Sequence, residues 1–132
     1  MIYETMFEKL VKIGIITPDG KLNFSGHIKV KNPPYMDLNI DQLCTTEKGE
    51  IIISLAHNFI QNGDVMADPD MEIMIHPHKM IEALTYQLDS LGVYQVVYPE
   101  PGKVIPQRKT ELNRFLNQWL TNLIDQGFNV VV

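Results

Sequence analysis

The segment Gln61–His78, QNGDVMADPDMEIMIHPH, gathers four acidic residues: Asp64, Asp68, Asp70 and Glu72. Hard cations such as Mg²⁺ and Ca²⁺ take several oxygen ligands, which clustered carboxylates on a loop can supply. The spacing is not that of a calcium loop, which has a glycine at its sixth position and an acid at its twelfth. Asp and Asn also close turns through side-chain hydrogen bonds. Turn formation, a cation site and an acidic docking surface therefore all remain open explanations.

Histidines supply the second set of candidates. His76 and His78 flank Pro77, and His57 lies in an apolar run where it is either a buried structural residue or a proton carrier. A zinc site built from these histidines and Glu72 is the more specific alternative. We expect no bound metal or cofactor. The candidate binding residues are Asp64, Asp68, Asp70, Glu72, His57 and His76.

Two catalytic signatures fit poorly. Pro69-Asp70 resembles the start of a metal-dependent nuclease motif, but that chemistry needs a second acid and a lysine two residues later on one strand, to bind the metal and orient water. No such pair follows on a strand. Cys44 lies at a predicted strand end with no evident neighbouring base. We assign no catalytic residue, and phosphodiester hydrolysis by a metal on the Asp64–Glu72 acids is kept as the enzyme alternative.

Bulk composition limits the class of protein. The chain has 132 residues, a formal net charge of −5 and one cysteine. Its length and the lack of a linker predict a single domain over residues 1–132. No apolar run is long enough for a membrane helix, and the N-terminus does not look like a secretory signal. The single cysteine suits the cytoplasm. The acidic balance argues against general nucleic-acid binding.

The elements that must position these residues follow from hydrophobic periodicity. Apolar residues spaced by three and four predict helices over 2–13 and 110–126, with Thr110 as N-cap and Gly127 as C-cap of the second. Alternation predicts strands over 27–31, 35–44, 71–76, 80–88 and 93–98. The apolar run 51–60 predicts a central strand covered on both faces, and Asn62-Gly63 a hairpin.

This order predicts an α+β fold: an antiparallel meander of five or six strands, an N-terminal helix and a long C-terminal helix packed on the sheet. Residues 80–88 could also be helical, but their alternation favours a strand. Within this fold, Gln61–His78 is expected to be a hairpin turn that presents a rigid acidic loop.

Three stretches resemble known families. ISLAHNFIQNGDVMADPDMEIMI, ALTYQLDSLGVYQVVYPEPGKV and LNRFLNQWLTNLIDQG together resemble a family of small bacterial proteins of unknown function with a QNGD-x-M-x-DPDME motif. The resemblance spans roughly residues 36–128 and implies a coherent domain that is often encoded on plasmids, integrative elements and phages. The C-terminal half is also similar to a second family of proteobacterial proteins. Neither resemblance supplies catalytic residues.

Two functions from different classes follow. The first is a non-enzymatic binding or regulatory protein, an accessory factor of a mobile element in its most specific form, which acts on a protein partner through its sheet face or acidic loop. The second is the metal-dependent hydrolase described above. The missing lysine favours the first, as does the sufficiency of turn formation to explain the acids. The chain is expected to be a monomer or a homodimer.

Overall fold

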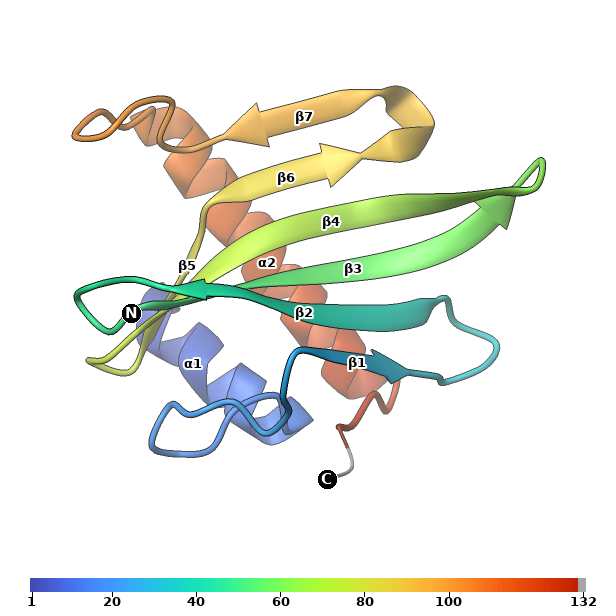
Figure 1. Cartoon of the computed structure of the whole chain (residues 1–132), viewed down its shortest axis with the longest axis horizontal. Coiled ribbons are helices and arrows are strands. Elements are labelled where there is room, and N and C mark those ends of the chain that lie inside the picture. Colours follow the sequence, from blue (N-terminus) through green and yellow to red (C-terminus); the bar gives the residue numbers. More distant parts are fainter. Residues whose placement is uncertain (131–132) are drawn as a thin grey trace.

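The computed structural model describes residues 1–130. Two helices, α1 (Ile2–Ile13) and α2 (Pro106–Asp125), lie behind one antiparallel sheet and leave its front face free of helices (Figure 1). The strands are β1 (His27–Val30), β2 (Asp37–Thr45), β3 (Ile51–Gln61), β4 (Asp64–His76), β5 (Met80–Ala83), β6 (Thr85–Leu88) and β7 (Val93–Val96). A short 3-10 turn, Asp89–Leu91, joins the last two strands. The predicted α+β fold is confirmed.

The sheet follows the order β1-β2-β3-β4-β6-β7, and β5 pairs with β4 outside this path. Residues 80–88 therefore form two strands rather than one, because the chain breaks at Leu84 and moves from one part of β4 to another. The end of β4 pairs with β5, as in Ile75 with Ile81, whereas Asp70 in its middle pairs with Gln87 of β6. The strand preference for this region is confirmed, although not as one continuous strand.

The hydrophobic core lies between the sheet and the two helices. Alternate residues of β2, β3 and β4 point into it and are almost completely buried: Leu38, Ile40, Ile53, Leu55, Met71, Ile73 and Ile75. Met6 and Leu10 of α1 and Leu116 and Leu120 of α2 meet them there. The prediction that β3 is covered on both faces is wrong, because Ser54 and Asn58 alternate with the core residues and are only half-buried.

Both predicted helices are present in the structure. The helix α1 has the predicted bounds and ends at Gly14, whose φ of 93° is the left-handed conformation that glycine adopts easily. In contrast, α2 begins four residues before the predicted start, since Pro106 occupies its first turn. The N-cap prediction is wrong, because Thr110 lies inside the helix and donates to the Pro106 carbonyl. The predicted glycine does end the helix: Gly127 directly follows the C-cap residue Gln126, has a left-handed φ of 86° and donates its N–H to the Ile124 carbonyl.

The Asn62-Gly63 hairpin between β3 and β4 is confirmed, with φ of 52° at Asn62 and 86° at Gly63. The expectation of an acidic loop after it is wrong, because β4 starts at Asp64 and continues to His76. Proline lacks the N–H that a ladder needs and is therefore disfavoured inside a strand. The register shows how it is accommodated: Asn58 pairs with Ala67 and Ala56 with Asp70, so a bulge takes up the extra residue of β4.

Candidate functional site

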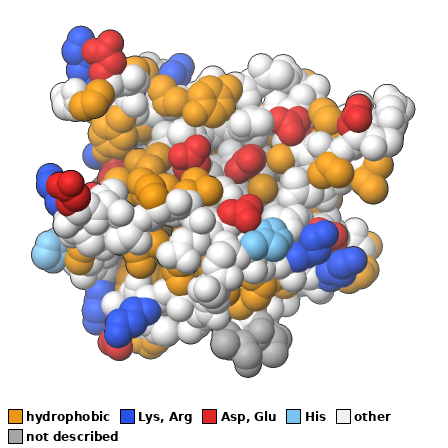
Figure 2. All heavy atoms as spheres, viewed as in Figure 1, with side chains coloured by type: hydrophobic (Ala, Val, Ile, Leu, Met, Phe, Trp, Pro, Cys, Tyr) orange, Lys and Arg blue, Asp and Glu red, His pale blue; other side chains and the backbone are white. Residues whose placement is uncertain are grey.

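The front face of the sheet carries some of the acidic residues that were predicted as candidates from the sequence. Because neighbouring strands keep a fixed register, side chains on this face form rows across the sheet. Asp41, Ser54 and Glu72 are cross-strand partners in one row, and Asn39, Ala56 and Asp70 form the next. Figure 2 shows acidic side chains gathered across the middle of this face. We call the row residues Asn39, Asp41, Ser54, Asp70 and Glu72 the polar rows.

Some of these acidic side chains already have partners within the protein. Asp41 Oδ1 lies 2.6 Å from His27 Nδ1, and the Ser54 hydroxyl donates to Asp41 Oδ2 at 3.4 Å. At the far side of β4, Asp89 accepts from the Ala67 backbone N–H at 2.8 Å and from the Gln87 amide at 2.6 Å. These bonds fix the two flanking carboxylates in place.

The surroundings of Asp70 disfavour the ionised form of its carboxyl group. Burial raises the pKa of its carboxyl, and the negative charges of Glu72, Asp89 and Asp41 raise it further. Within residues 1–130, neither Asp70 nor Glu72 forms an ion pair. A positive group placed here would relieve the repulsion among the four acids. The arrangement therefore suits a cationic ligand.

Apolar side chains lie next to the polar rows. The β3–β4 hairpin extends past the rest of the sheet (Figure 1), and its cross-strand pair Ile60 and Val65 is 75% and 72% exposed. A shallow hollow of about 400 Å³ connects this pair to the rows, and its lining includes Asp37, Asn39, Asp41 and Phe59. Large exposed apolar side chains beside charged ones are typical of surfaces that bind other proteins.

The remaining predicted residues do not join this site. Asp64 is exposed beside the hairpin turn, where it pairs with Gln61. Asp68 lies in the bulge and accepts hydrogen bonds from the backbone N–H and the hydroxyl of Ser90. The four acids of the segment are therefore spread along one long strand. Within the described part of the chain, no three His, Cys, Asp or Glu side chains come together in a way that could hold a metal ion.

The three histidines of the prediction occupy separate surroundings. His57 is buried between the rings of Trp119 and Phe128, both with centroids 5.5 Å away, and burial lowers the pKa of its imidazole. His76 bridges two carboxylates, with Nε2 3.0 Å from Glu82 and Nδ1 3.4 Å from Glu50. The turn residue His78 is exposed.

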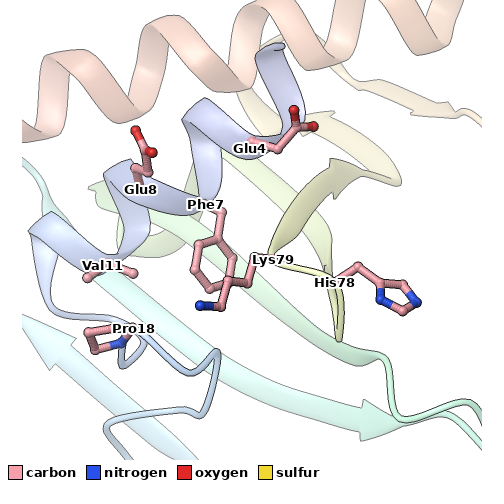
Figure 3. A pocket seen from close by; sticks show the side chains of 7 residues that line it. All are labelled: Glu4, Phe7, Glu8, Val11, Pro18, His78 and Lys79. Atoms are coloured by element: carbon pink, nitrogen blue, oxygen red, sulfur yellow. The ribbon is translucent and has the colours of Figure 1, made fainter.

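A second surface feature is the groove in which His78 lies. Phe7, Val11 and Pro18 supply its apolar surface, Glu4 and Glu8 lie along α1, and His78 and Lys79 come from the β4–β5 turn (Figure 3). Its volume is about 460 Å³. Carboxylates and a lysine line this groove together, whereas on the sheet face the acids Asp70 and Glu72 of β4 lie strands away from His27 and Lys29, which end the rows at β1.

Sequence analysis also missed two polar anchors of the fold. Asn113 of α2 is 2% exposed, accepts from the Ala83 backbone N–H at 2.8 Å and donates to the Lys109 carbonyl at 2.7 Å. Glu82 is buried beside Lys109 and accepts a hydrogen bond from the Tyr98 hydroxyl. No sequence signal distinguishes Asn113 from Asn117 and Asn122 of the same helix, which are half-buried and exposed, except that its position falls next to Leu112 and Leu116 on the apolar stripe.

Comparison with known protein families assigns the chain to a family. Residues 5–129 match the family described as Domain of unknown function (DUF6908). The chain belongs to this family. The match to DUF6908 includes α2, the whole sheet and α1 from Thr5 onward, and so it includes the polar rows. Curated proteins and solved structures gave no match. None of the helices in residues 1–130 is both long and apolar enough to cross a membrane.

Proposed function

We propose that the protein is a non-enzymatic binding protein that holds a basic segment of a partner protein on the front face of its sheet. The observation that carries this proposal is the position of Asp41, Asp70 and Glu72 in two neighbouring cross-strand rows, on a face that no helix covers. Burial raises the pKa of Asp70, and the negative charges of Glu72, Asp89 and Asp41 raise it further; lysine or arginine side chains would offset this repulsion.

The shape of the face supports an extended partner. The polar rows run across the strands, and the exposed Ile60–Val65 pair lies beside them at the hairpin. A partner segment that crosses the face can place cationic side chains on the carboxylates and an apolar side chain against this pair. Charge complementarity then selects the partner, and the apolar contact adds buried area. An accessory role in a mobile element would be one setting for such a protein.

Phosphodiester hydrolysis stays the alternative prediction. It would need Asp64, Asp68, Asp70 and Glu72 to act together on one metal. In the structure Asp64 lies at the hairpin end, Asp68 is bound by Ser90, and only Asp70 and Glu72 share the sheet face. We prefer the binding function because its residues already lie together.

The proposal is tested with a fluorescent peptide in which lysines alternate with leucines, titrated by anisotropy in about 150 mM salt so that long-range attraction is screened. We expect saturable binding that weakens at least about fivefold in the double variant Asp70→Asn/Glu72→Gln, in keeping with the loss of close charge pairs. The matched control is Glu4→Gln/Glu8→Gln, which removes the same charge from α1. Equal weakening by both pairs, or no binding at millimolar peptide, would contradict the proposal.

A further inference from the structure

The two edges of the sheet differ in how they are protected. β1 carries His27 and Lys29, and Lys31 and two prolines follow it closely. Charges and prolines of this kind keep an edge strand from pairing with another chain. At the opposite edge, the stretch from Ser90 to Tyr98, which contains β7, has no charged residue. Within the described residues, no strand pairs with the outer side of β7.

The backbone of β7 shows which groups face outward. The N–H of Val97 donates to the Leu84 carbonyl at 2.9 Å, so this N–H points inward, toward β6. Alternate residues of an antiparallel strand point their N–H and C=O groups to opposite sides, so those of Tyr94 and Val96 face away from β6. The Val96 carbonyl accepts from the Arg108 guanidinium at 3.5 Å, which is at the long limit of a hydrogen bond. The other three groups are available to a new strand.

The structure points to a second copy of this chain as the occupant of that edge, and we propose that β7 pairs antiparallel with β7 of the copy about a two-fold axis at Gln95. In this register Tyr94 of each copy pairs with Val96 of the other, so two-fold symmetry satisfies the outward groups of both strands together. The 60% exposed Tyr94 ring then packs beside the branched Val96 side chain.

Charge and symmetry both favour a copy as the partner. Two chains of net charge −5 repel one another, but no acidic residue lies between Ser90 and Tyr98, so pairing at β7 brings no strand carboxylates together. The protected β1 edge prevents β1-to-β7 pairing, which would not close and would give open chains. The interface is small, so the dimer is expected to be weak and to depend on concentration. Both polar faces would lie on the same side of the joined sheet.

Analytical ultracentrifugation from about 10 µM to about 1 mM tests the pairing, over a range suited to a weak interface. We expect the average mass to rise toward that of a dimer. Tyr94→Pro removes an outward N–H and leaves the ladder to β6 intact, because proline is tolerated on the solvent side of an edge strand. It should weaken dimerisation at least about tenfold, whereas Tyr94→Ala, which keeps the N–H, should weaken it less.

Cross-linking tests the register independently. Directly opposed residues of a pair that exchanges no hydrogen bonds have Cα atoms about 4.5 Å apart, within the range that a disulfide spans. In a Cys44→Ser background, which removes the exposed native thiol, Gln95→Cys should form an intermolecular disulfide on mild oxidation. The control Ser90→Cys, exposed beyond the strand end, should not. A monomer at all concentrations overturns the proposal, as does a dimer unaffected by Tyr94→Pro or equal cross-linking at both positions.

Discussion

The indole of Trp119 lies against the imidazole of His57, with ring centroids 5.5 Å apart and the planes tilted by 55°. The contact joins α2 to β3 and places both side chains in the core behind the sheet face. It also explains why His57, a candidate binding residue, does not take part in the site: its ring points to the helices, while its neighbours Ala56 and Asn58 lie on the other face of the strand.

Truncating this indole should be among the most destabilising single changes. Trp119→Ala should lower the free energy of unfolding by about 3–5 kcal/mol, because it leaves a large cavity between α2 and the sheet. The indole N–H has no hydrogen-bond partner within residues 1–130, so the loss is one of packing. Urea denaturation measures it. Phe115→Ala is the control, since Phe115 is partly exposed on the same helix and should cost less. A near-wild-type midpoint for Trp119→Ala would show that the indole is not part of the core.

His57 should make the protein less stable in mild acid. Its folded-state pKa is lowered from 6.5 by burial, so below pH 6.5 the unfolded chain binds the proton more readily. Stability contributed by the neutral imidazole is therefore complete above pH 6.5 and is lost as the pH falls toward the lowered value. His57→Phe should cost about 1–3 kcal/mol from overpacking at pH 7.5 and remove this pH dependence. The check is the difference in unfolding free energy between the two proteins from pH 7.5 to 5, which should shrink.

Asn113 should act as a buried link between α2 and β5. Asn113→Ala should cost about 1–3 kcal/mol, because the Ala83 N–H and the Lys109 carbonyl both lose a partner in the protein interior. Thermal unfolding followed by circular dichroism measures this cost. Asn122→Ala on the exposed side of the same helix should change stability by less than about 0.5 kcal/mol. Similar effects of the two substitutions would contradict the assigned role.

Asp70 should be a source of instability at neutral pH. Its folded-state pKa lies above the ordinary value of 3.8, so the folded protein binds the proton more readily and stability rises as the pH falls through the raised pKa. Asp70→Asn should increase the Tm at pH 7 by about 1–3 °C, and the advantage should disappear near pH 4. Asp64→Asn removes the same charge from the exposed hairpin and should leave the Tm unchanged. A lower Tm for Asp70→Asn would argue against the crowding of carboxylates.

Sequence patterns predicted the elements of the fold better than the site. Strict apolar spacing from Leu112 to Leu123 and alternation from Met36 to Ile40 identified a helix and a strand, because burial on one face imposes those periods. The extent of β4 was not predictable from local signals. Pro69 lacks the backbone N–H that a strand ladder uses, and only the pairing of Ala67 and Asp70 with β3 shows that a bulge lets the ladder continue past it.

The polar rows could not be predicted from any single segment of the sequence. Asp41 lies in the predicted strand 35–44, and Asp70 and Glu72 are neighbours in sequence. Ser54 lies between Asp41 and Glu72 in one row. This arrangement depends on the register of three strands, which the hydrophobic pattern alone does not determine. The acids nearest in sequence, Asp64 and Asp68, turned out to lie apart from these rows.

Binding of a basic segment by the front face of the sheet is the function that we propose. Its most direct test is an NMR titration of the ¹⁵N-labelled protein with the lysine–leucine peptide, because amide shifts report where the peptide lies. We expect saturable shifts in β2, β3 and β4 around Asp41, Asp70 and Glu72, and their loss in Asp70→Asn/Glu72→Gln. Shifts confined to α1 and the β4–β5 turn, or shifts that persist in the double variant, would contradict it.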